Sequence, residues 1–127
     1  MDELIALHGT RVLLCAVDGP PLGSEADAGD ILGAAWGQDA TLVAVPVARL
    51  GPGFLRLSTR VAGAIAQKFV NYRMQLVILG DIGAALAGSG ALRDFVRESN
   101  AGRSLWFLAD LAALERKLAP PHQSGMM

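Results

Sequence analysis

Residues 61–80 read VAGAIAQKFVNYRMQLVILG and decide the fold. In the first half of this stretch, apolar residues recur in pairs four positions apart with polar residues opposite them, which is the pattern of an amphipathic helix. The pairs are Val61 and Ala62, Ile65 and Ala66, and Phe69 and Val70. After a short polar break, the apolar run 74–79 ends at Gly80 and predicts a buried strand. A one-sided helix followed closely by a buried strand is the repeating unit of an α/β protein.

The N-terminal segment predicts an antiparallel opening of the sheet. Residues 4–7 and 12–17 are short apolar runs, and the link at 8–10, HGT, is short enough for a hairpin. The consecutive prolines at 20–21 then end the second strand, because proline lacks an N–H donor.

The next two elements continue the alternation of helix and strand. Ser24 with Asp27 resembles a capping box and begins a first amphipathic helix, which ends near Gly37. The continuous apolar run 41–47 predicts a strand that is covered on both faces, so we place it in the middle of the sheet.

The C-terminal third predicts two more helices and a last strand. Residues 83–90 are small and predict a flexible loop, and the helix that follows ends at 100–102, NAG. Residues 104–108 predict the last strand, and Asp110 can cap a final helix that ends at the prolines 120–121.

The sequence therefore predicts an α/β fold with a mixed sheet of about five strands and about four helices. A β-hairpin comes first, and alternating helices and strands follow with right-handed crossovers and parallel later strands. We expect residues 1–119 to form a single α/β domain and residues 120–127 to form a flexible C-terminal tail.

Composition excludes several functional classes. Eleven basic residues stand against twelve acidic ones, for a net charge of −1, which leaves no overall field to attract nucleic acid or an anionic membrane. No apolar run is long enough for a transmembrane helix, and the acidic start at residues 1–3 is unlike a signal peptide. The single cysteine, Cys15, lies in an apolar run and predicts a buried core thiol in a reducing compartment, so we expect a cytoplasmic protein.

Four stretches also carry a family resemblance. They are 67–73 (QKFVNYR), 80–82 (GDI), 92–103 (LRDFVRESNAGR) and 106–107 (WF). With them the chain resembles, over about residues 3–118, the bacterial domain family of unknown function DUF4180. The family pattern commonly has a Glu after the Ala-Gly of the central helix, where this chain has Ala64. The resemblance implies a family but no activity.

The order of the elements is similar to that of STAS domains, the anti-sigma-factor antagonists. That similarity implies a phosphoryl-regulated binding module whose phospho-acceptor Ser or Thr begins the central helix. Ser58 and Thr59 hold this place by topology, although the acidic, glycine-rich motif of STAS domains is absent from the sequence.

Four polar residues before the central helix form the first candidate site. A helix N-terminus offers unpaired N–H groups and partial positive charge, so Ser58 and Thr59, flanked by Arg56 and Arg60, could hold an anion or accept a phosphoryl group. Simple helix capping is the alternative for the two hydroxyls.

Asp81 and Asp110 form the second candidate site. Each follows a buried strand at the edge where open α/β sheets place their ligands, so a carboxylate pair is conceivable. A turn residue at Asp81 and a helix cap at Asp110 are the alternatives. We predict no cofactor and no metal, because glycine-rich phosphate motifs are missing and His8 and His122 lack accompanying ligands.

Two functions follow from these sites. The first is a non-enzymatic, STAS-like interaction or regulatory domain that binds a protein partner or an anionic ligand through residues 51–60 and the central helix. The second is a small cofactor-independent enzyme, of the kind found in secondary metabolism, with a pocket lined by Arg56, Asp81 and Asp110. One observation would distinguish the two hypotheses. A deep apolar pocket that contains carboxylates with perturbed pKa values would favour the enzyme.

Self-association is a further hypothesis. Trp36, Phe54 and Leu55 are apolar residues near breakers or helix ends, and we consider them as an exposed homodimer patch.

Overall fold

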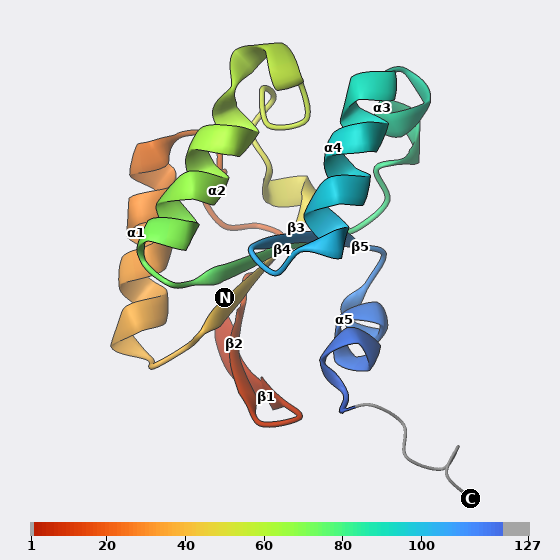
Figure 1. Ribbon diagram of the computed structural model, residues 1–127. Helices are drawn as coiled ribbons and strands as arrows, with labels where there is room; N and C mark the ends of the chain where they lie inside the picture. The colour runs from red at the N-terminus through yellow and green to blue at the C-terminus, as the bar shows by residue number, and fades with distance from the viewer. Residues whose placement is uncertain (1, 121–127) are drawn as a thin grey trace, which may run out of the picture.

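The computed structural model describes residues 2–120, which form a five-stranded sheet with helices on both of its faces (Figure 1). The elements in chain order are β1 (Glu3–Leu7), β2 (Thr10–Leu14), α1 (Glu25–Gly37), β3 (Leu42–Pro46), α2 (Val61–Asn71), β4 (Gln75–Leu79), α3 (Gly83–Ala87), α4 (Gly90–Ala101), β5 (Leu105–Leu108) and α5 (Leu111–Leu118). Two 3-10 turns, η1 (Val47–Arg49) and η2 (Leu57–Thr59), lie between β3 and α2. The predicted tail at 120–127 falls almost wholly outside the described residues.

The strands lie in the order β1-β2-β3-β4-β5. β1 and β2 pair antiparallel, and every later pair is parallel, so the predicted mixed sheet is confirmed. β3 is the middle strand, and its residues Leu42, Val43, Ala44 and Val45 are fully buried, as the continuous apolar run predicted.

The helices are distributed unequally over the two faces. Because the parallel strands advance in one direction across the sheet, right-handed crossovers place α1, α2 and α4 on the same face (Figure 1). The larger core cluster lies under these helices and includes Ile65, Phe69 and Ile78. The opposite face has a smaller cluster, in which Leu114 of α5 packs with Trp106 and Val77.

Two local predictions need correction. Residues 83–90, predicted as a flexible loop, contain the short helix α3. In the turn that leads into α3, the Asp81 carboxylate accepts a hydrogen bond from the Gly83 N–H at 2.8 Å. At α1, Ser24 accepts from the Asp27 N–H, but Asp27 in turn accepts from the N–H of Gly23 and not from that of Ser24. The reciprocal bond of a capping box is therefore shifted by one residue.

Asn100 joins the end of α4 to β5. Its side chain accepts a hydrogen bond from the Phe107 N–H at 2.7 Å and donates one to the Phe107 carbonyl at 3.2 Å. Nearby, the Lys117 ammonium donates to the Asn100 carbonyl and lies 4.7 Å from the centre of the Trp106 ring. The stretch 92–107, which carries much of the family resemblance, is thus a packed joint between α4, β5 and α5.

No helix within residues 2–120 is long and apolar enough to cross a bilayer.

Candidate functional site

Residues 51–60 form a surface segment that one aromatic side chain fastens to the core. Phe54 is 0% exposed and belongs to the core cluster under α1 and α2. The segment also begins with a close backbone contact, because a Cβ on Gly51 would lie 2.7 Å from the Gly23 Cα. The prediction that Phe54 is part of an exposed homodimer patch is therefore wrong. Of the other two residues predicted for that patch, Leu55 is only partly buried and Trp36 is 58% exposed.

The segment leads into α2 through an unusual helix start. α2 begins at Val61, and the N-cap residue is Arg60, whose backbone is left-handed with a φ of 62°. The expectation that Ser58 or Thr59 holds the N-cap position is wrong, because this left-handed residue moves the helix start further along the chain.

The two hydroxyl groups before α2 differ in their surroundings. The Thr59 hydroxyl lies 2.7 Å from the carbonyl oxygens of both Gly53 and Arg56, which share its single hydrogen, and it accepts a bond from the Val61 N–H at 3.3 Å. Ser58 is exposed, and its hydroxyl makes no hydrogen bond within residues 2–120. Thr59 therefore stabilises the turn, and Ser58 is the hydroxyl available at the surface.

Positive charge gathers at this end of α2. Arg56 and Arg60 are exposed, neither forms an ion pair in the described part of the chain, and the first turn of α2 has no acidic residue. The other long helices begin with a side-chain cap, whereas α2 has none. Two arginines beside a helix N-terminus at which the N-cap residue supplies no capping side chain, and Thr59 accepts only the Val61 N–H, can hold an anion.

Asp81 and Asp110 follow neighbouring strands, as predicted, since Leu79 at the end of β4 pairs with Leu108 of β5. Each carboxylate is occupied locally: Asp81 accepts from the Gly83 N–H, and Asp110 accepts from the Ala113 N–H, both at 2.8 Å. Both residues are exposed, and no hydrogen bond or ion pair among the described residues joins them. The turn and the cap are therefore the roles that the geometry supports for these carboxylates.

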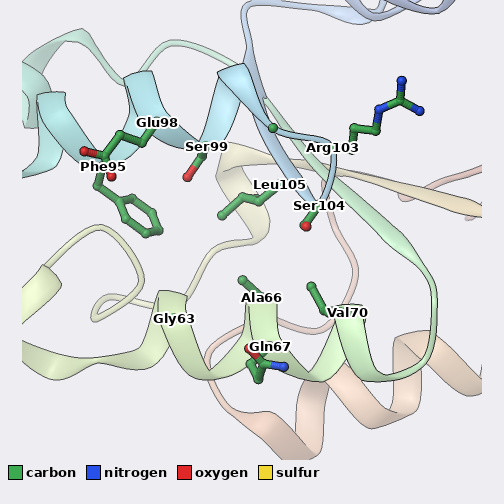
Figure 2. A pocket seen from close by; sticks show the side chains of 11 residues that line it. Gly63, Ala66, Gln67, Val70, Phe95, Glu98, Ser99, Arg103, Ser104 and Leu105 are labelled. Atoms are coloured by element: carbon green, nitrogen blue, oxygen red, sulfur yellow. The ribbon is translucent and has the colours of Figure 1, made fainter.

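Five pockets of the described residues lie elsewhere. One groove of about 390 Å³ runs between α2 and α4 at the start of β5 (Figure 2). Gly63 and Ala66 leave room on the α2 side, and Phe95 and Ser99 of α4 reach toward them (Figure 2). This groove was not predicted from the sequence, where the available signal is the spacing of the small residues Gly63 and Ala66 on one side of the helix.

A buried arginine was also missed. Arg49 is 3% exposed, and its guanidinium donates to the Pro20 carbonyl at 2.9 Å, the Asp2 carboxylate at 3.0 Å and the Ala16 carbonyl at 3.2 Å. Gly19 makes room for it, since a Cβ there would lie 2.5 Å from the Arg49 Cζ. In the sequence Arg49 only follows an apolar run, which gives no sign that it is buried.

Cys15 lies beside this cluster and is 3% exposed, which confirms the predicted core thiol. Burial raises the pKa of the Cys15 thiol to about 12, and the negative charge of Asp2 and a hydrogen bond to it act in the same direction, while Arg49 lowers it. The thiolate is the reactive form, so Cys15 is not a nucleophile near neutral pH.

The raised pKa predicts a loss of stability in alkaline solution. An unfolded thiol releases its proton near pH 8.5, but the folded one does so only near its pKa of about 12. The folded state therefore binds more protons between these values, and the free energy of unfolding falls as pH rises through that window. Urea denaturation at pH 8 and at pH 10.5 should show that the free energy of unfolding falls more between these two pH values for the wild type than for Cys15→Ala. Equal falls would contradict the raised pKa.

Comparison with known proteins identifies a family only. A sequence profile of the family described as "Domain of unknown function (DUF4180)" matches residues 7–118. No curated protein and no solved structure matches the chain.

Proposed function

The chain belongs to the DUF4180 family of domains of unknown function, and on this premise we propose that it is a cytoplasmic, STAS-like regulatory module that binds without turnover. In this proposal, residues 51–60 and α2 form the contact surface, and the start of α2 holds an anionic group of a protein partner. The observation that carries it is that Arg56 and Arg60 form no ion pair among the described residues and lie at a helix N-terminus whose N-cap residue supplies no capping side chain.

The two hydroxyls take different roles in this proposal. Thr59 keeps the turn in place through its bonds to Gly53, Arg56 and Val61. Ser58 is then the candidate phospho-acceptor, because its hydroxyl is exposed and its modification would break no hydrogen bond. A phosphoryl group there would bring negative charge to the helix N-terminus and the two arginines, where it is favoured.

The local use of the carboxylates supports a binding module over the alternative enzyme. Arg56, Asp81 and Asp110 line none of the five pockets identified in residues 2–120. Each carboxylate instead accepts a backbone N–H that its own turn or helix supplies.

We expect inorganic phosphate to bind weakly at this place, with a dissociation constant of about 1 mM, because the site is exposed and screened by salt. A phosphate titration followed by ¹⁵N–¹H NMR at constant ionic strength should shift the amides of residues 61–63. The double variant Arg56→Gln/Arg60→Gln should reduce these shifts several-fold, since it removes both charges. Arg97→Gln is the matched control, because Arg97 is an exposed arginine of α4 that Asp94 already neutralises at 2.7 Å.

Two substitutions at Ser58 provide a second test of the site. Ser58→Glu places a carboxylate at the same position and should abolish the phosphate shifts, whereas Ser58→Gln should preserve them. Unchanged shifts in the double arginine variant, or shifts spread evenly over the surface, would rule out an anion site at the start of α2.

A further inference from the structure

We propose a second, separate binding site at the other end of α2, which takes a small molecule that carries an anionic group next to an aromatic or flat apolar group. The site lies at the amino ends of β3, β4 and β5. A pocket of about 390 Å³ there is lined by Arg73, Arg103, Gln75, Thr41 and Ser104, together with Thr10, Val70 and Met74. Its lining includes two guanidinium groups and no carboxylate, so it favours an anion.

Among residues 2–120, no structural partner explains the two arginines. Arg73 and Arg103 are exposed, and neither side chain forms a hydrogen bond or ion pair with any other described residue. In Figure 2, the Arg103 side chain extends away from the groove between α2 and α4. The guanidinium is therefore not used to fill that groove.

A cation at a helix C-terminus often only neutralises the helix dipole, and in this chain other residues already do so. Arg11 donates to the Gln38 and Asp39 carbonyls at the end of α1, at 3.0 and 3.1 Å. Lys68 lies in the last turn of α2, and Lys117 donates to the Asn100 carbonyl at the end of α4. The charges of Arg73 and Arg103 come in addition to these three.

The backbone of Arg73 strengthens the inference. Its φ of 55° lies in the left-handed region, where it follows α2 and donates its N–H to the Val70 carbonyl at 2.9 Å. This position after a helix favours glycine, because a Cβ is crowded in the left-handed conformation. His8, Asp39 and Arg60 share this conformation, but at Arg73 it is combined with a guanidinium that has no partner among the described residues, which supports a use for the side chain.

The apolar part of the ligand has a place beside the arginines. A second pocket of about 250 Å³ shares Thr41, Arg73 and Met74 with the first and is also lined by Trp36, Tyr72 and Asp39, so a carboxylate borders this apolar part and not the first pocket. These aromatic side chains are 58% and 47% exposed, respectively. Together the pockets have the size of small-molecule sites, with an anionic end at the arginines and aromatic faces for a ring.

Phenyl phosphate is a suitable probe, with inorganic phosphate and phenol as the two half-molecules. We expect phenyl phosphate to quench Trp36 fluorescence and to bind at least about tenfold more tightly than either half, because both pockets are filled. Trp106, the other tryptophan, is only 8% exposed, and a Trp36→Phe variant gives its background signal. Arg73→Gly should weaken binding about tenfold without loss of stability, because glycine suits the left-handed backbone, and Arg103→Gln should weaken it similarly.

In the Arg56→Gln/Arg60→Gln variant, quenching of Trp36 by phenyl phosphate should follow the wild-type titration, because Trp36 reports only on this site, so this site and the site at the start of α2 can fail independently. Wild-type affinity in both Arg73→Gly and Arg103→Gln would overturn the proposal. Phenyl phosphate that binds no more tightly than inorganic phosphate would also overturn the proposal. Tighter binding of an acidic peptide containing phenylalanine would assign the site to a protein segment and would also overturn it.

Discussion

Replacing Phe54 with alanine is expected to lower the free energy of unfolding by about 3–5 kcal/mol, because it empties a fully buried ring position in the core. For a domain of this size, the melting temperature should fall by roughly 10–20 °C. Urea denaturation followed by circular dichroism measures the first quantity, and thermal denaturation measures the second. Phe54→Leu keeps most of the volume and should cost less than half as much.

The same substitution separates anchoring from binding. If Phe54 fastens residues 51–60 to the core, Phe54→Leu should keep the phosphate-induced shifts of residues 61–63, because the backbone of the segment keeps its place. A loss of less than about 1 kcal/mol in Phe54→Ala would mean that the ring is not packed as described, since surface substitutions have effects of that size.

Replacing Arg49 with methionine is expected to cost about 2–4 kcal/mol. The substitution leaves the carbonyls of Pro20 and Ala16 without their donor and the Asp2 carboxylate without its cation. Asp2 remains 32% exposed and keeps the Ala16 N–H as a donor, so water can solvate part of the charge and the cost stays below that of a fully buried pair.

A double-mutant cycle with Asp2→Asn measures this contact. We expect the two substitutions together to cost less than the sum of their separate effects, because each removes the same ion pair. Arg56→Met is the matched control for the loss of a positive charge, and as an exposed site it should change stability by no more than about 0.5 kcal/mol. Additive effects of the Asp2 and Arg49 substitutions would show that the pair is not coupled.

The sequence predicted the order of the elements because strands β3 and β4 and helix α2 follow simple rules of burial. A strand covered on both faces must be apolar throughout, as in 42–45, and a helix on one face of a sheet must repeat its apolar pairs, as in 61–70. These patterns are local, so one sequence is enough to identify them.

The parts that were missed depend on contacts between distant residues. Phe54 stands alone among glycine and proline breakers, so no periodicity indicates that its ring enters the core. Arg49 is buried only because Asp2, Ala16 and Pro20 converge on it from another part of the chain. The left-handed backbone of Arg60, which sets the start of α2, has no sequence signal either, since most such positions are glycine.

The candidate sites show the same limit. The arginines before α2 could be identified from their place next to a predicted helix. The pocket at the amino ends of the strands could not, because Thr41, Arg73 and Arg103 come together only when three separate connections meet at one edge.

The hydrogen bonds between Asn100 and Phe107 also bear on aggregation. β5 is an outermost strand, and exposed backbone groups on such a strand invite a foreign strand to extend the sheet. Phe107 offers its N–H and carbonyl outward, but the Asn100 amide already occupies both. A chain that added there would have to displace Asn100, so this one side chain opposes extension of the sheet at Phe107.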